Sequence, residues 1–456
     1  MRSNGNHILA EEDVGKLLRK LSVPATVGMF VMSTFNIVDT IFVGHGVGTF
    51  GIAGVALNFP VLILVLAIGQ LFGMGGASII SRAIGADDLS KVNRTFGNVV
   101  LCTTAFAVML SIPGLIFLDK FVMILGATEE VFPHARDYLQ VVLFGTIFRS
   151  FIILANNIIR AEGHAKVSMT VMIISAVLNI ILDAIFIFVF KMGVRGAAIA
   201  TLISHFTASM YAVSFFLSGK STIRFQNIDL RPDWKIIREI VSIGMASLGR
   251  NISSSALVMI VNNVFSGMSF PLGIAIYGII NRTLFMFLTP IMGITQGIQP
   301  VVGYNFGAKR YPKINEVVKI AYIRALTINT LIFAVLLIFP NYIFSAFTKD
   351  PELIEHGVPA LRIMAMVFPI VGAQLIGAAV FQAMGKAVKA FVLTMTRQAI
   401  FLIPLILIGS KLYGTDGVFW SFPISDLLSA VVTVLFVRTT LKALSNMPPE
   451  DFGDPI

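Results

Sequence analysis

Long apolar runs, separated by short polar segments, follow one another from Leu21 to Val437. A helix of about 20 apolar residues crosses the roughly 30 Å hydrocarbon core of a bilayer. The pattern therefore predicts twelve transmembrane helices, at 21–44, 52–80, 96–118, 137–159, 167–190, 196–218, 236–265, 273–305, 317–340, 358–383, 388–409 and 416–437. The second and eighth of these are too long for one straight crossing, which predicts tilt or extension beyond the bilayer.

Composition supports an all-α polytopic membrane protein. Hydrophobic residues make up 56% of the chain and charged residues 13%, whereas soluble domains carry about 25% charged residues. The polar amino terminus contains no signal-peptide core, so we expect no cleavage. Cys102 is the single cysteine, which excludes a disulfide framework.

The net charge of +10 comes from Lys and Arg residues whose distribution along the chain indicates the membrane topology. Most Lys and Arg residues outside the predicted spans lie before the first span, in alternate loops and after the last span. This asymmetry predicts a multi-pass protein of the cytoplasmic membrane with both termini inside the cell. The basic residues then contact anionic membrane lipids, and we expect no nucleic-acid partner.

The chain repeats itself at an offset of 222 residues. Gly75 corresponds to Gly297, and Lys91 to Lys313. Each half holds six predicted spans, an arrangement typical of secondary transporters built from parallel repeats. We predict an amino-terminal lobe at 1–218, a cytoplasmic linker at 219–235 and a carboxy-terminal lobe at 236–456.

Two carboxylates interrupt apolar runs of the first half at similar predicted depth, Asp39 and Asp183. Asn179 precedes Asp183 by four residues and so shares its helical face. Asn36 precedes Asp39 by three residues and shares a face with it in the same way. Thr201 is expected at the same level. Ionisable groups in a membrane are costly and therefore functional by default, and these oxygens would suit H⁺ or Na⁺. The counterparts in the second half are Asn262 and Leu405. The alternative, a helix-end Asp that reaches the headgroups or pairs with a buried Arg, stays open.

The second half carries embedded charges of both signs. They are Arg250, Arg282, Arg397 and Asp426. If the arginines line a cavity, they favour an amphipathic or anionic substrate; alternatively they pair with Asp426 or with helix carbonyl groups. A structural role and a transport role of Asp426 are equally compatible with the sequence.

An enzyme is not expected. The chain contains neither a P-loop nor a His-Glu-x-x-His metal motif, and Cys102 has no plausible His partner. No cofactor is predicted beyond H⁺ or Na⁺ as the coupling ion.

With these features the chain resembles the multidrug and toxic compound extrusion (MATE) family. The resemblance rests on the two sixfold repeats, the Gly-rich second span around Gly73 and Gly75, Arg160-Ala161-Glu162-Gly163, and Asn179 with Asp183 in the fifth span. It is closest to prokaryotic branches whose cation site lies in the amino-terminal lobe.

The resemblance implies specific roles for residues of this chain. It assigns ion coupling to Asp39, Asn179, Asp183 and Thr201, a hinge to Pro24, and cavity lining to Asn156, Asn157 and Met172, to which the residues add Asn36. The second-lobe carboxylates of some other branches are missing, since Ser253, Ser254 and Gln374 occupy the corresponding regions.

These observations predict a monomeric antiporter that exports small amphipathic organic compounds, cationic ones above all, in exchange for H⁺ or Na⁺. The alternative is a flippase for a lipid or lipid-linked precursor in the same superfamily, which the second-half arginines would favour. A membrane scaffold or receptor is disfavoured, because soluble domains and long external loops are nearly absent.

Overall fold

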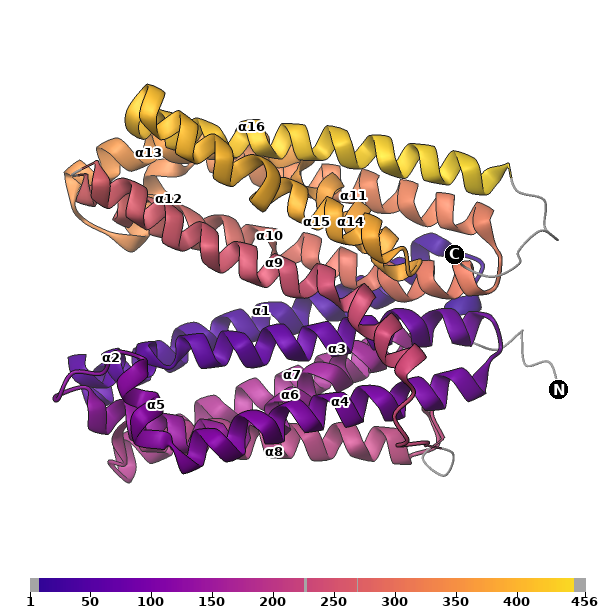
Figure 1. The fold of residues 1–456 in the computed structure, drawn as a ribbon. Coiled ribbons are helices and arrows are strands. Elements are labelled where there is room, and N and C mark those ends of the chain that lie inside the picture. Colours follow the sequence, from indigo (N-terminus) through magenta and orange to yellow (C-terminus); the bar gives the residue numbers. More distant parts are fainter. Residues whose placement is uncertain (1–7, 225–227, 269, 447–456) are drawn as a thin grey trace. The chain divides into compact units, whose positions relative to one another are not determined.

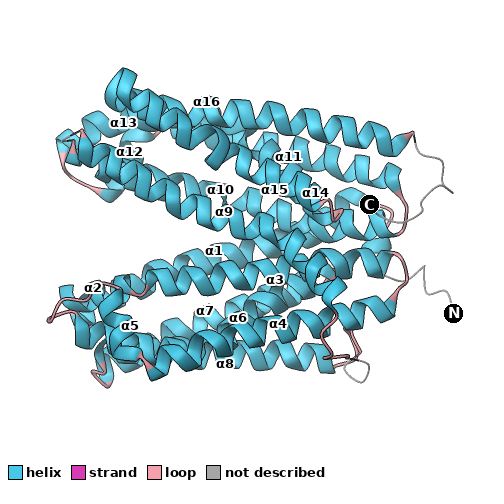
Figure 2. Ribbon diagram, in the orientation of Figure 1, coloured by secondary structure: helices cyan, strands magenta, loops and turns pink. Residues whose placement is uncertain are grey.

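The chain is α-helical throughout the part that the computed structural model describes, residues 8–224, 228–268 and 270–446 (Figures 1 and 2). A helix satisfies its own backbone hydrogen bonds, as a segment inside a bilayer must. Within this part, nine helices are long and apolar enough to cross a membrane, or ten if one bent pair forms a single span. The all-α membrane class predicted from the sequence is confirmed.

The elements of the first half follow one another in this order: η1 (Ile8–Ala10), α1 (Val14–Val47), α2 (Thr49–Leu57), α3 (Phe59–Gly85), α4 (Leu89–Ile116), α5 (Leu118–Ile124), α6 (Phe132–Ala161), α7 (Ala165–Asp183), the π-helical segment η2 (Ala184–Val189) and α8 (Gly193–Leu217).

The second half contains α9 (Trp234–Gly267), α10 (Pro271–Gly307), α11 (Tyr311–Ile338), α12 (Pro340–Phe347), α13 (Pro351–Ala365), α14 (Phe368–Ala383), α15 (Ala387–Met395), the π-helical segment η4 (Thr396–Leu402) and α16 (Ile403–Ser445).

The helices form two compact units. The amino-terminal unit comprises Val23–Gly244, and the carboxy-terminal unit comprises Met1–Ser22 and Met245–Ile456. The first turns of α1 therefore pack with the second half of the chain: Arg324 Nη2 donates to the Gly15 carbonyl at 2.9 Å, and Lys313 Nζ donates to the Glu12 carbonyl at 2.6 Å. The first turns of α9 correspondingly belong to the amino-terminal unit.

The long second span is interrupted at one residue. It consists of α2 and α3, which meet at Asn58. Pro60 lies in the first turn of α3, where it lacks the N–H needed to continue the preceding helix. Asn58 is fully buried, and its Nδ2 donates to the carbonyl oxygens of Gly54 at 2.8 Å and Ala135 at 3.2 Å. The side chain thus fastens the break to α6.

The last three predicted spans are irregular as well. Helices α13 and α14 are bent by 51°, next to Pro369 in the first turn of α14. The 59-residue stretch Ala387–Ser445 changes direction at Gly414, whose φ of 59° and ψ of −136° are not helical. Gly409 and Gly417 lie in backbone contact across this point. Two spans therefore fit in the stretch.

Helix α9 follows the predicted span 236–265 but is less apolar than the others. It is 34 residues long and is absent from the candidate spans. Arg250 and the Asn and Ser residues that follow it lower its hydropathy.

Two glycines allow close packing of α3 and α9 within the amino-terminal unit. A Cβ on Gly75 would lie 2.1 Å from the Ile240 carbonyl oxygen, and a Cβ on Gly244 would lie 2.0 Å from the Leu71 carbonyl oxygen. The same contact recurs in the carboxy-terminal unit, where a Cβ on Gly297 would lie 2.2 Å from Ser22 Oγ. The repeat therefore preserves a close helix crossing in each unit.

We expect Gly75→Ala and Gly244→Ala each to destabilise the protein. The new methyl group would meet backbone atoms, which cannot rotate away, and overpacking typically costs about 1–3 kcal/mol. Thermal unfolding of the purified protein measures the effect. Gly278→Ala is the control, since no atom lies within 4 Å of its Cβ position. A loss of stability in the control equal to that in both variants would contradict the packing role.

Candidate functional site

The site is centred on Asp183, the last residue of α7. Its side chain is fully buried, and the π-helical segment η2 begins at the next residue. Such π-helical turns occur often at functional sites, because the extra residue per turn re-aims the side chains around it.

Asn179 and Thr201 hold one edge of this carboxylate. Asn179 is oriented with its amide nitrogen 2.6 Å from Asp183 Oδ2 and its oxygen 3.1 Å from the Thr201 backbone nitrogen and 3.0 Å from the Thr201 hydroxyl. The opposite orientation keeps the 3.0 Å bond to the hydroxyl but faces the amide oxygen towards the carboxylate, which disfavours it. Helices α7 and α8 are thereby joined at the level of Asp183.

Asp39 brings α1 to the same point. Its carboxyl group is half-buried and lies close enough to that of Asp183 for the two to interact directly. Ionised carboxylates are acceptors only, so a hydrogen bond between the two groups requires a proton. Asp183 Oδ1 is buried and receives no N–H or O–H donor from the described residues. The pair therefore needs a proton, or a cation in its place.

The structure adds a residue that sequence reasoning missed. Tyr138 on α6 is buried and lies within electrostatic range of Asp39, Asp183 and Arg149. Its side chain packs beside Val194 of α8. A tyrosine near the start of a predicted span has no signal in one sequence that would separate it from ordinary interface aromatics.

The donor set suits H⁺ or Na⁺ better than a transition metal. It offers carboxylate oxygens beside the Thr201 hydroxyl, and hard cations prefer oxygen ligands. Among the residues described, no group of three or more His, Cys, Asp or Glu side chains could hold a metal ion. The arrangement can bind a monovalent cation and release it when the carboxyl groups separate.

The predicted cavity residues lie elsewhere in the same unit. Asn156 and Asn157 are buried; Asn156 Oδ1 accepts from Ser168 Oγ at 2.8 Å, and Asn157 Oδ1 accepts from Arg160 Nη2 at 2.8 Å. The first bond ties α6 to α7, and the second lies within α6. The side chain of Asn36 lies outside the described part of the chain.

Pro24 and Met172 both lie near the point where α1 enters the amino-terminal unit. Pro24 is buried inside α1, two residues after Ser22, where the chain passes from one unit to the other. One turn later a Cβ on Gly28 would lie 2.8 Å from Met172 Sδ. Half-buried Met172 therefore packs against α1 close to its proline.

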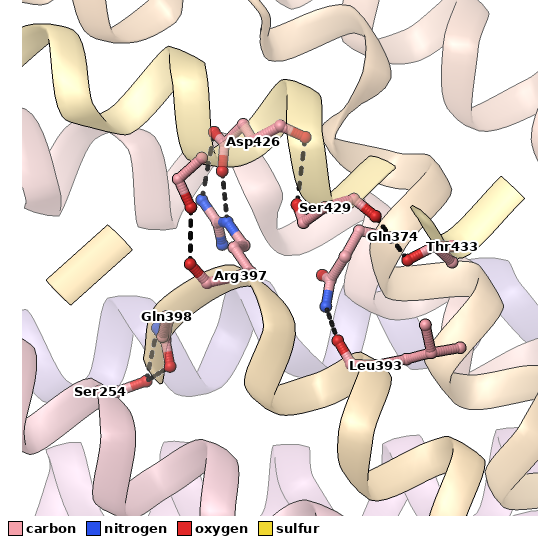
Figure 3. A network of polar contacts seen from close by, with 9 residues as sticks. Ser254, Gln374, Leu393, Arg397, Gln398, Asp426, Ser429 and Thr433 are labelled. Atoms are coloured by element: carbon pink, nitrogen blue, oxygen red, sulfur yellow. Dashed lines mark hydrogen bonds and ion pairs between the residues drawn. The ribbon is translucent and has the colours of Figure 1, made fainter. Parts of the chain in front are cut away.

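Two of the charged residues of the second half form an ion pair. Arg397 Nε donates to Asp426 Oδ1 at 2.6 Å and Nη2 to Oδ2 at 3.5 Å (Figure 3). The side chains are 22% and 8% exposed, so the pair is largely desolvated. Arg250 is half-buried and Arg282 is exposed. The pairing with Asp426 that the sequence left open is the arrangement found for Arg397.

Polar side chains continue around this ion pair. Ser254 and Gln398 hydrogen-bond to each other at 3.0 Å and 3.1 Å, and Gln374 Nε2 donates to the Leu393 carbonyl at 3.0 Å (Figure 3). Arg397 and Gln398 both lie in η4. Among the residues labelled in Figure 3, Asp426 is the one carboxylate.

Comparison with known proteins gives consistent matches over nearly the whole chain. The MatE family model matches residues 24–185 and 246–408, one stretch in each half. The multidrug export protein MepA of Staphylococcus aureus is 28% identical over 438 residues, which cover 96% of each chain.

Two solved structures show the same fold. An outward-facing multidrug resistance MATE family transporter of the MOP superfamily is 27% identical, with a TM-score of 0.90 over 98% of this chain and all of that one. A MOP superfamily transporter from Pyrococcus furiosus, for which a reversed polarity of the binding pocket suggests a different function, is also 27% identical, with a TM-score of 0.89 and the same coverage.

Proposed function

The chain belongs to the MatE family, a family of secondary active transporters, and we propose that it exports small amphipathic organic compounds, cationic ones above all, in exchange for H⁺ or Na⁺. The observation that carries the proposal is the cluster of Asp39, Asn179, Asp183 and Thr201. Their contacts join α1, α7 and α8 through groups that need a proton or a cation between them. The similarity to a multidrug export protein supports the substrate class.

The internal repeat argues that this cluster serves transport. Asp39 and Asp183 correspond to Asn262 and Leu405 in the second half. A purely structural need of the shared fold would apply to both halves. The acidic pair is therefore a property added to the first half alone, as a coupling site would be.

In the proposed cycle the coupling cation and the substrate exclude each other. A proton or Na⁺ between Asp39 and Asp183 draws α1 towards α7 and α8, narrows the space in this unit and expels the substrate outward. Loss of the cation lets the carboxylates repel each other and separate. Pro24 lacks one backbone hydrogen bond and is the hinge at which α1 bends.

The remaining parts of the proposal concern the oligomeric state, the topology, the lobes and the cavity. The protein is a monomer of the cytoplasmic membrane with both termini in the cytoplasm, in contact with anionic lipid. Its lobes are 1–218 and 236–456, joined by the linker at 219–235. Cavity lining is assigned to Asn36, Asn156, Asn157 and Met172. The polar candidates of the second lobe, apart from this cavity, are Arg250, Arg282, Arg397 and Asp426.

A flippase for a lipid or lipid-linked precursor is the second candidate function. The different function suggested for the Pyrococcus furiosus relative and the embedded arginines favour it. The ion pair between Arg397 and Asp426 counts against it, because a paired arginine attracts an anionic headgroup less. Antiport is therefore the better supported function.

Transport into proteoliposomes tests the proposal. A proton gradient and a Na⁺ gradient are imposed in separate experiments. We expect one of them to drive a fluorescent cationic dye against its own concentration gradient, and the gradient that does so identifies the coupling ion. Liposomes without protein are the control. Dye movement under neither gradient, together with headgroup translocation of a labelled anionic lipid, would favour the flippase instead.

A further inference from the structure

A buried carboxylate outside the coupling cluster holds the linker. Glu162 follows α6 and is fully buried. Its Oε1 and Oε2 accept from Ser221 Oγ at 2.8 Å and 3.0 Å, and Oε1 accepts from the Ile223 backbone nitrogen at 3.3 Å. Two linker residues, Ser221 and Ile223, are thus bonded to one side chain.

A hydrogen-bonded turn at the end of α6 fixes the backbone at Glu162. The chain leaves α6 through Gly163, whose φ is +88°, and the Gly163 and His164 nitrogens donate back to the Arg160 and Ile159 carbonyls at 2.8 Å and 3.0 Å. Such a turn caps a helix and fixes the residue before the glycine.

The second half has the same turn without the carboxylate. Gly385 has a φ of +73°, and the Lys386 nitrogen donates to the Phe381 carbonyl at 3.0 Å. At the offset of 222, Glu162 corresponds to the buried Met384. The turn therefore does not require Glu162, whereas the linker, which exists once in the chain, uses it.

Other contacts guide the rest of the linker along α4. The Arg224 nitrogen donates to Asn93 Oδ1 at 2.9 Å, and the Asp233 nitrogen donates to Asn98 Oδ1 at 2.8 Å. Beyond the linker, Glu239 of α9 pairs with Arg82 at 2.9 Å and Lys91 at 3.2 Å. The described linker residues on both sides of 225–227 and the first turns of α9 are thus attached to the amino-terminal unit.

We propose that Glu162 is a positioning residue that fastens the linker to the amino-terminal unit and makes this attachment weaken as the pH around the linker rises. The inference concerns the linker and is independent of the proposed antiport. Its geometric basis is a fully buried carboxyl group whose described partners are all linker donors.

The charged groups around Glu162 do not neutralise it. Arg160 bonds to Asn157 and Ser168, and His164 packs edge-to-face on Phe215. In the described residues, none of the neighbouring ionisable side chains makes an ion pair within 4.0 Å of Glu162; these neighbours are Arg160, His164, Lys166, Lys220 and Arg224.

The direction of the pH effect follows from linkage. Burial raises the pKa of Glu162 from 4.5 to about 7, although the bonds from Ser221 and Ile223 lower it. The docked linker thus favours the protonated form. Docking is fully supported below the ordinary pKa of 4.5 and loses this support as the pH rises through about 7.

His164 acts in the opposite direction at lower pH. Burial lowers its pKa below 6.5, so the docked state favours the neutral imidazole and loses that support as the pH falls. Measurements between about pH 6.5 and 8.5 therefore isolate Glu162, since only the carboxyl group titrates in this window.

Hydrogen–deuterium exchange of the Thr222 and Ile223 amides tests the proposal. Protection factors, which correct for the intrinsic pH dependence of exchange, should fall several-fold from about pH 6.5 to 8.5 in the unmodified protein. Glu162→Gln keeps an acceptor oxygen but does not titrate, so its protection should not vary with pH. Glu162→Met, which installs the residue of the second half, should lose most of the protection at every pH.

Controls separate anchoring from a folding defect. Ser214→Ala should leave both protection factors unchanged, because the exposed Ser214 hydroxyl donates to the Tyr211 carbonyl within α8. A Glu162→Met chain that keeps its elution volume and its protection in α6 reports the linker alone. Full protection of Thr222 and Ile223 in Glu162→Met would overturn the anchor. A pH dependence equal in the unmodified protein and Glu162→Gln would overturn the pH sensitivity.

Discussion

Asp183→Asn should abolish gradient-driven efflux while preserving substrate binding. The amide keeps an acceptor for Asn179 but cannot exchange the proton or cation that the pair with Asp39 requires. We expect transport under a gradient to fall by roughly 10-fold or more, the scale of a coupling free energy of about 1–3 kcal/mol. Dye flux in proteoliposomes and dye binding in detergent measure the two properties separately.

Asp39→Asn should behave in the same way, because it installs the amide found at Asn262 in the second half. Asp119→Asn is the matched control, since this carboxylate is 59% exposed and pairs with Arg136 away from the cluster. Efflux at the unmodified rate in both Asp39→Asn and Asp183→Asn would refute the coupling role.

Asp426→Leu should strongly destabilise the carboxy-terminal unit. The substitution leaves Arg397 largely buried without its partner, and breaking a buried ion pair typically costs about 3–5 kcal/mol. The double variant Arg397→Met with Asp426→Leu should recover most of that loss, because an apolar pair of similar volume removes the uncompensated charge. Thermal unfolding of the single and double variants measures both effects.

The same double variant separates the two candidate functions. Antiport through the amino-terminal cluster should survive it, since neither residue belongs to that cluster. Ser254→Ala, which removes only the bond to Gln398, is the control for changes near η4. Loss of dye efflux in a stable double variant would assign Arg397 or Asp426 a direct role in transport.

The sequence predicted the helical content and the general position of the spans, because hydrophobic run length is imposed by the bilayer. It did not predict where helices break. The break at Asn58 depends on a side chain that bonds to the carbonyl of Ala135, 77 residues away. The turn at Gly414 depends on the approach of Gly409 to Gly417. Such long-range or close backbone contacts leave no periodic signal.

The candidate site was predictable to the extent that its residues are unusual for their surroundings. Asp39 and Asp183 are conspicuous in apolar runs, and the four-residue spacing places Asn179 on the face of Asp183. Tyr138 and Glu162 were not identified as site residues, since a tyrosine or a loop glutamate is ordinary by type. Only burial and specific partners distinguish them.

The measurement that tests the central claim most directly is dye affinity at a series of proton and Na⁺ concentrations. Mutual exclusion requires that the coupling cation weaken dye binding, and linkage makes the effect reciprocal. We predict that affinity falls as one of the two cations rises in the unmodified protein and that Asp183→Asn removes the dependence. Dye affinity that is independent of both cations in the unmodified protein would contradict the account.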